Sequence, residues 1–133
     1  MRTVLTMTTS PQRMKHLPIV LDSLFNQIAQ PDSVYLNLPA RYRNCETYKI
    51  PDWLNDWRVT VLRPSYDFGP VMKILPVLEV ETDMETLLIT VDDDVRYSPD
   101  TISTLKIHLM LTYHQPLVPG GLILQTIVHI LNR

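Results

Sequence analysis

The regular alternation of short apolar runs with segments of helical spacing constrains the fold most. Four runs predict strands, at residues 4–7, 34–38, 59–62 and 86–91. The segments between and after them predict helices within residues 11–28, 69–78 and 101–113. Strands that alternate with helices favour a mostly parallel sheet with helices on both faces. We therefore expect one α/β domain over residues 1–133, in which a Rossmann-like region spans residues 1–116 and an apolar tail spans 117–133.

Proline and capping residues mark the expected helix starts. Ser10 has the chemistry of an N-cap, and Pro11 suits the first helical position. Pro18 can also begin the main helix, because proline interrupts a helix that is already under way. Gly69 and Pro70 are expected to open the second helix. The apolar face of the first helix is predicted to contain Leu17, Val20, Leu21, Leu24, Phe25 and Ile28.

Three consecutive acids, Asp92, Asp93 and Asp94, follow the apolar run at residues 87–91 directly. Like charges this close repel one another, and a divalent cation with hard oxygen ligands is the usual physical solution. Ligands of open α/β sheets bind at the carboxyl ends of the strands. The acids therefore predict a metal site at that edge. Either the first and third carboxylates are both aimed at one ion, or one is aimed at the ion and the other at a ligand hydroxyl. A solvated acidic turn is the alternative.

Two other polar segments are expected near the same edge. Thr8, Thr9 and Arg13 follow the first strand and lead into a helix, and helix starts favour anions. Lys73 is expected in the first turn of the second helix, where the helix dipole disfavours a cation unless a phosphate is near. The alternatives are an ordinary helix cap and a surface lysine.

The charge distribution agrees with a ligand that carries both phosphate and a cation. The net charge of −2 gives no reason to expect bulk nucleic-acid binding. Residues 1–75 hold nine Lys and Arg against six Asp and Glu, while residues 76–133 hold three against eight. Random surface charge is the alternative explanation for this asymmetry.

Several other classes of protein are disfavoured. The single cysteine, Cys45, excludes an intramolecular disulfide and a cysteine-based zinc site, and we expect it in a loop. No secretory signal is evident at residues 1–7, and no apolar window of about 18 residues predicts a membrane span. We therefore expect a cytoplasmic protein that neither spans a membrane nor binds nucleic acid. The apolar tail could drive self-association through residues 117–131.

The histidines and tryptophans are interpreted as structural or surface residues. Trp53 and Trp57 lie four apart, and packing is favoured over stacking on a substrate. None of the histidines has metal-ligand spacing; they are His16, His108, His114 and His129.

Three segments together carry a resemblance to a known family. They are residues 5–13 (LTMTTSPQR), 66–73 (YDFGPVMK) and 89–97 (ITVDDDVRY). In this order they resemble the nucleotide-sugar-dependent glycosyltransferases of the GT-A fold, in particular the small viral and bacterial family-2-like enzymes. The three acids correspond to the DXD motif of that family. The resemblance covers about residues 3–110.

The resemblance implies a role for each acid. Asp94 would ligate the Mn²⁺ or Mg²⁺ that bridges the diphosphate of a nucleoside-diphosphate-sugar donor. Asp92 would contact the ribose, the metal or a water bound to it, with Asp93 close by.

The resemblance also implies which residues hold the donor. Thr8, Thr9 and Arg13 would line the nucleotide pocket, and Lys73 would lie near the base or the phosphates. The sugar would pass to a carbohydrate or glycoconjugate acceptor.

The later part of the chain departs from the family pattern. Only 39 residues follow Asp94, and no Asp or Glu follows Asp100 to serve as the general base of an inverting enzyme. A non-catalytic nucleotide-sugar-binding module is therefore the alternative, and we expect slow transfer or none. A phosphoryl-transfer domain would need an acid after the first strand, where Thr8 and Thr9 stand.

Overall fold

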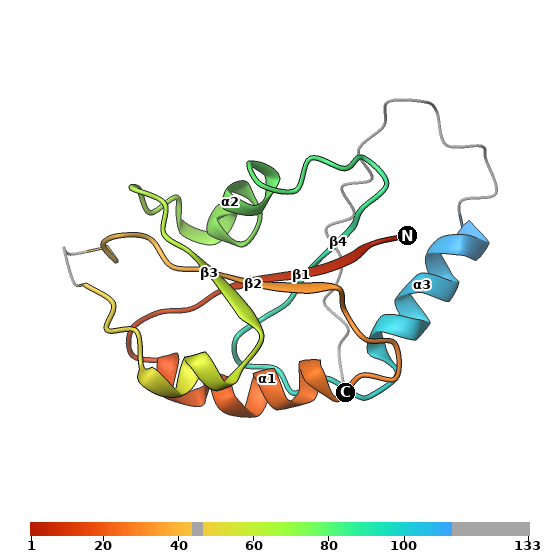
Figure 1. Cartoon of the computed structure of the whole chain (residues 1–133), viewed down its shortest axis with the longest axis horizontal. Helices are drawn as coiled ribbons and strands as arrows, with labels where there is room; N and C mark the ends of the chain where they lie inside the picture. Colours follow the sequence, from red (N-terminus) through yellow and green to blue (C-terminus); the bar gives the residue numbers. More distant parts are fainter. Residues whose placement is uncertain (44–46, 113–133) are drawn as a thin grey trace.

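The computed structural model describes residues 1–43 and 47–112, and its centre is a four-stranded parallel sheet. The strands lie in the order β3-β2-β1-β4 (Figure 1). Their bounds are β1 Thr3–Thr8, β2 Ser33–Asn37, β3 Val59–Leu62 and β4 Leu87–Thr90. The expected Rossmann-like α/β fold is therefore confirmed. Cys45 and the apolar tail lie outside the described residues.

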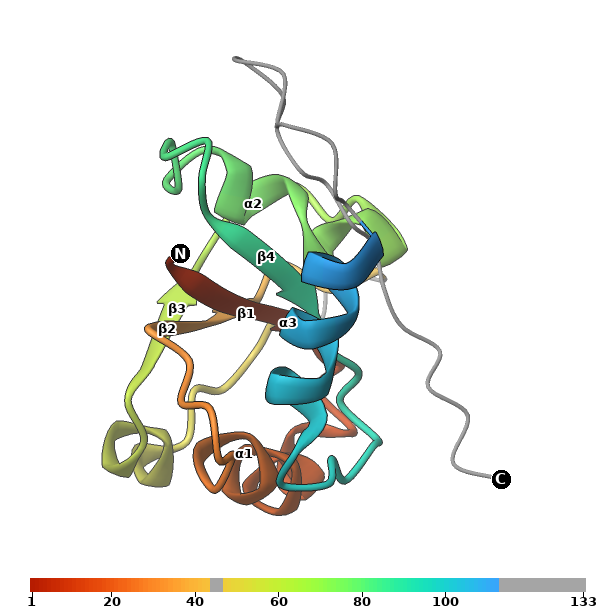
Figure 2. The ribbon, with the colours of Figure 1, turned by 90° about the vertical axis from the view of Figure 1, so that its right-hand side faces the viewer.

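Helices cover both faces of the sheet. Helix α1, Leu17–Phe25, and the short helix α2, Leu75–Leu78, lie on opposite faces (Figure 1). Helix α3, Thr101–Thr112, joins the face of α1 and runs beside β4 (Figure 2). Within the described residues, no helix is long and apolar enough to cross a membrane.

Strands β1 and β4 are buried almost throughout because both of their faces are covered. Along β1, Leu5 and Met7 enter the main core under α1 and α3. Val4 packs with Val77 and Leu88 in a smaller cluster under α2. This alternation is the period of two that a strand imposes on its side chains.

The first helix begins later than Pro11 predicts. A 3₁₀ helix, Met14–His16, precedes α1, and the Ser10 carbonyl rather than its side chain accepts hydrogen bonds from the next turn. Pro18 has no N–H to donate to the Met14 carbonyl, so a continuous α-helix through this point is not possible. Ile28 lies beyond the end of α1 and is 75% exposed, so its assignment to the buried face was wrong.

The second predicted helix is divided in two. Residues Gly69–Lys73 form a 3₁₀ helix, and α2 follows it. Pro76 cannot donate to the Met72 carbonyl, as a continuous α-helix would require. Lys73 therefore lies in the last turn of a 3₁₀ helix rather than in the first turn of an α-helix. The expected unfavourable interaction between its charge and the start of a helix dipole is therefore absent.

The two tryptophans pack, as their spacing predicted. Trp57 stacks on Phe25 with 5.7 Å between ring centroids, and both Trp53 and Trp57 contact the main core. They lie in or beside the 3₁₀ helix Asp52–Asp56.

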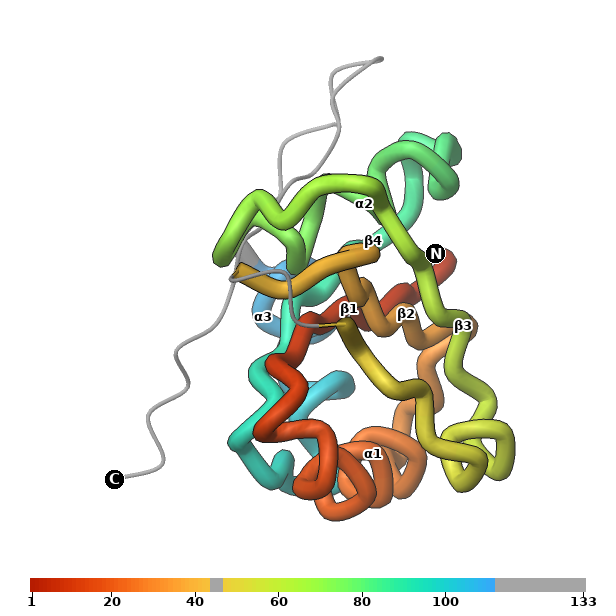
Figure 3. Tube along the Cα trace, turned by 90° about the vertical axis from the view of Figure 1, so that its left-hand side faces the viewer, coloured from red at the N-terminus to blue at the C-terminus, as the bar shows by residue number. Residues whose placement is uncertain are grey.

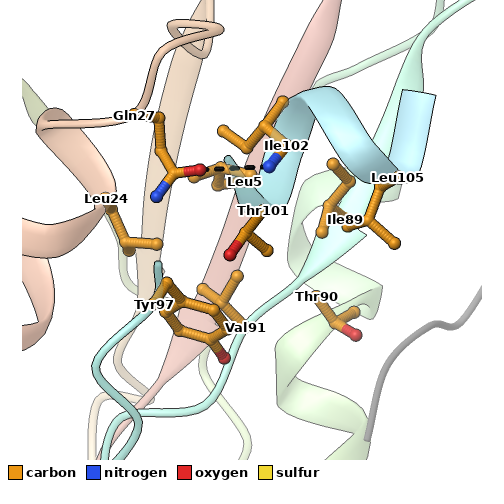
Figure 4. A pocket seen from close by; sticks show the side chains of 10 residues that line it. All are labelled: Leu5, Leu24, Gln27, Ile89, Thr90, Val91, Tyr97, Thr101, Ile102 and Leu105. Atoms are coloured by element: carbon orange, nitrogen blue, oxygen red, sulfur yellow. Dashed lines mark hydrogen bonds between the residues drawn. The ribbon is translucent and has the colours of Figure 1, made fainter. Parts of the chain in front are cut away.

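A buried glutamine fastens α3 to α1. The Gln27 amide donates to the Ser98 carbonyl at 2.7 Å. Its oxygen accepts from the Ile102 N–H at 3.0 Å (Figure 4). The cavity beside it has a volume of only about 20 Å³ and mostly apolar walls. That is room for one water molecule, so this hollow is a packing feature and not a ligand site.

A charged network closes the opposite, amino edge of the sheet. Arg2 donates to the two carboxylate oxygens of Glu81 at 3.1 and 2.8 Å, and the Tyr35 hydroxyl donates to the same carboxylate at 2.8 Å. The hydrogen bond from Arg2 holds the pKa of Glu81 below its ordinary value. Burial, followed by the bond to Glu81, raises the pKa of Tyr35.

Replacing Glu81 with glutamine should lower the free energy of unfolding at pH 7 by about 1–3 kcal/mol, because hydrogen bonds to a charged group are lost. Folding lowers the pKa of Glu81 from its unfolded value of 4.5. The stability that this gives is fully present above pH 4.5 and is lost as the pH falls through the pKa of the folded state. The difference from the unaltered chain should therefore vanish in acid. Urea denaturation from pH 7 to 3 measures it. The exposed neighbour Glu79, changed to Gln, is the control, and an equal effect there would contradict the assignment.

Candidate functional site

A cavity of about 580 Å³ opens at the carboxyl edge of the sheet, the side that faces the viewer in Figure 3. Its walls come from the segments that follow all four strands. Every residue predicted to form the site lines it: Thr8, Thr9, Arg13, Lys73, Asp92, Asp93 and Asp94. The expected convergence is therefore confirmed, while the chemical role of each residue stays a prediction.

The strand order explains why these segments meet. The chain passes outward from β1 to β2 and β3, and then returns to place β4 on the other side of β1. The loops after β1 and β4 therefore adjoin at the point where the strand order reverses. Open α/β sheets bind ligands at such a switch point.

Asp93 joins these two loops. It is buried, with 8% of its surface exposed. One carboxylate oxygen accepts from the Thr9 hydroxyl at 2.7 Å, and the other accepts from the Arg13 guanidinium at 3.0 Å. Both oxygens are thus engaged, so Asp93 holds the wall of the cavity together.

Asp92 is paired with Lys73 across the cavity. Its backbone N–H donates to the Tyr97 hydroxyl at 2.7 Å, which fixes the start of the acidic run. Burial raises the pKa of Tyr97 to about 12, so this hydroxyl stays protonated at neutral pH. Tyr97 was not predicted as a site residue.

Asp94 is the most open of the three acids. Its side chain is 60% exposed, and its nearest cation is Arg13, at 3.7 Å. Asp92 thus pairs with Lys73, whereas Asp93 and Asp94 both have Arg13 near them. Among the residues that the structure describes, no group of three His, Cys, Asp or Glu side chains could hold a metal.

That the carboxylates of Asp92 and Asp94 are aimed at one ion stays a prediction. In this structure Lys73 and Arg13 offset the repulsion between the acids. A cation that takes one or two carboxylates and completes its shell with phosphate oxygens still fits these donors, since Asp92 and Asp94 line the same cavity.

Buried polar residues of the sheet position Lys73. The Thr6 hydroxyl donates to the Lys73 carbonyl at 2.6 Å. The Asn37 amide donates to the Met72 carbonyl at 2.8 Å, which is the carbonyl that Pro76 leaves without a helical partner. Thr6 and Asn37 were not predicted as site residues. Their position inside a buried strand could have indicated them, because a buried polar group needs hydrogen-bond partners.

The segment after β2 adds aromatic and basic side chains. The buried Tyr48 hydroxyl donates to the Thr9 carbonyl at 2.7 Å, and the Tyr42 and Tyr48 rings meet edge to face. The Arg43 guanidinium lies 5.6 Å from the centre of the Tyr42 ring. These residues line the cavity, and only the abundance of Arg and Tyr at 41–48 could have indicated them.

A glycine turn completes the cavity after β3. The backbone of Gly69 has a φ of +64°, which favours glycine because a side chain would be strained there. Its N–H donates to the Asp67 carboxylate at 2.8 Å. The following Pro70 and Lys73 line the cavity with Asp67.

Comparisons with models of known protein families and with curated protein sequences gave no match. The functional assignment therefore depends on the geometry and charge of the cavity.

Proposed function

We propose that the chain binds a nucleoside-diphosphate sugar in the cavity at the carboxyl edge and transfers the sugar to a hydroxyl acceptor. It would act as a metal-dependent glycosyltransferase. The observation that best supports this is the meeting of three separate polar segments, those of Thr9, Lys73 and Asp94, in one cavity.

The size and charge of the cavity suit such a donor. Its volume of about 580 Å³ falls within the roughly 300–1,000 Å³ of ligand pockets. Arg13, Arg43 and Lys73 line it together with the acids. The cations would contact phosphate oxygens.

A divalent cation would be held by Asp94 and Asp92, with phosphate oxygens completing its shell. When bound, Mn²⁺ or Mg²⁺ neutralises the diphosphate leaving group as a Lewis acid. The ion pair between Asp93 and Arg13 would hold the loops after β1 and β4 together while the donor binds. Tyr97 would hold the backbone of Asp92 in place.

A non-catalytic nucleotide-sugar-binding module is the second candidate. The observation in its favour is that each carboxylate lining the cavity already has a cation or a backbone N–H near it. A carboxylate general base is therefore not evident among the described residues of the cavity.

Calorimetry of the unaltered chain tests donor binding. We expect UDP or GDP to bind with Mn²⁺ present and to bind much more weakly with EDTA, while uridine and guanosine bind weakly under both conditions. The reason is that phosphate oxygens supply most of the metal's ligands. Equal affinity for the diphosphates with Mn²⁺ and with EDTA would contradict the metal-dependent assignment, and no binding of any nucleotide would exclude the donor site.

A further inference from the structure

A second hollow adjoins the proposed donor cavity. Its volume is about 290 Å³, and it shares Arg13, Asp93 and Asp94 with that cavity. The start of α1 and the segment after the acids supply the rest of its wall. A molecule in this second hollow would therefore lie next to one in the cavity, with the Arg13–Asp93 ion pair at their common border.

The walls of the second hollow differ in chemistry from those of the cavity. Ile19, Val20 and Val95 give it an apolar side, and Ile19 is 60% exposed. His16 and Arg96 give it a polar side. An apolar side next to polar groups suits a hydroxyl compound with an apolar face rather than a second phosphate.

His16 is the group in this hollow that can accept a proton. Its ring makes no hydrogen bond or ion pair with any residue that the structure describes, whereas Asp93 and Asp94 each have Arg13 near them. A neutral imidazole nitrogen accepts a hydrogen bond from a hydroxyl and can then take its proton.

We propose that the second hollow binds the hydroxyl acceptor, in the form of a glycoside with an apolar aglycone, and that His16 is the general base of the transfer. The inference rests on the proposed function, since it needs a donor in the adjoining cavity. In the step, the acceptor oxygen forms a bond to the anomeric carbon as its proton passes to His16. The bond from that carbon to the diphosphate breaks, and its electron pair leaves with the nucleoside diphosphate.

The first test uses His16→Gln, with His108→Gln on α3 as the matched control. Release of UDP from UDP-glucose is measured in Mn²⁺ with water alone, with methyl β-glucoside and with phenyl β-glucoside. We expect phenyl β-glucoside to accelerate release most, and His16→Gln to lower kcat roughly 10²–10⁴-fold with unchanged UDP affinity. His108→Gln should behave as the unaltered chain. A change within twofold in His16→Gln would overturn the role of His16.

The second test fills the hollow. Ile19→Trp should raise KM for phenyl β-glucoside at least tenfold and leave the calorimetric affinity for UDP unchanged. Ile28→Trp is the control, because Ile28 is 75% exposed and does not line the hollow. An unchanged KM in Ile19→Trp would overturn the acceptor site, as would an unaltered chain that binds UDP without acceleration by either glycoside. Failure of both UDP and GDP to bind would instead refute the proposed function itself.

Discussion

Asp94→Asn is expected to lower the Mn²⁺-dependent affinity for UDP or GDP by at least roughly tenfold while the fold stays intact. Loss of a group that only orients a metal ligand already costs about 10–100-fold in metal affinity, and loss of a ligand should cost no less. Asp94 is 60% exposed and its nearest cation is 3.7 Å away, so its replacement disturbs little of the structure. Calorimetry with Mn²⁺ and with EDTA measures the effect.

The matched control for this change is Asp56→Asn. Asp56 is an exposed carboxylate at the end of the 3₁₀ helix Asp52–Asp56 and does not line the cavity. We expect its UDP affinity and its thermal unfolding to equal those of the unaltered chain. If Asp94→Asn binds UDP in Mn²⁺ as tightly as the unaltered chain does, and loses as much affinity in EDTA, the carboxylate does not hold the metal.

Asn37→Leu is expected to lower the free energy of unfolding by about 1–3 kcal/mol. Asn37 is fully buried and donates to the carbonyls of Met72 and Lys73. Leucine has a similar volume but no donor, so the Met72 carbonyl is left without a partner, while Thr6 still donates to the Lys73 carbonyl. Because these bonds hold the 3₁₀ helix Gly69–Lys73 against the sheet, UDP affinity should fall as well.

The comparison for this change is Asn55→Leu, at an exposed position of the 3₁₀ helix Asp52–Asp56. Surface changes of this kind usually stay within about 0.5 kcal/mol. Urea denaturation gives the stability of both variants, and calorimetry gives their affinity for UDP. A stable Asn37→Leu that binds UDP normally would show that the buried amide does not position Lys73.

Much of the fold could be predicted because it depends on local patterns. Apolar runs identified all four strands within one residue at each end, since a strand covered on both faces is rich in apolar residues. The starts of the helices were harder to predict from the prolines. Pro18 and Pro76 each lack a backbone N–H, so one carbonyl before each proline loses its α-helical partner. A 3₁₀ helix therefore precedes the α-helix at both places.

The sequence by itself placed polar residues at the carboxyl ends of β1 and β4, because their positions follow directly from where the apolar runs end. Parallel strands then bring those ends to one edge, so the convergence of Thr9, Arg13 and Asp94 could be expected before the contacts were known.

Only the tertiary structure decided the partner of each charge. Asp93 accepts from Thr9 and Arg13, which lie 84 and 80 residues away, and Thr6 holds Lys73 from 67 residues away. Periodicity describes neighbours along the chain and carries no information about such pairs. For the same reason the sequence indicates only an ordinary surface residue at His16, and the folded chain places it in the wall of the same hollow as Asp93 and Asp94.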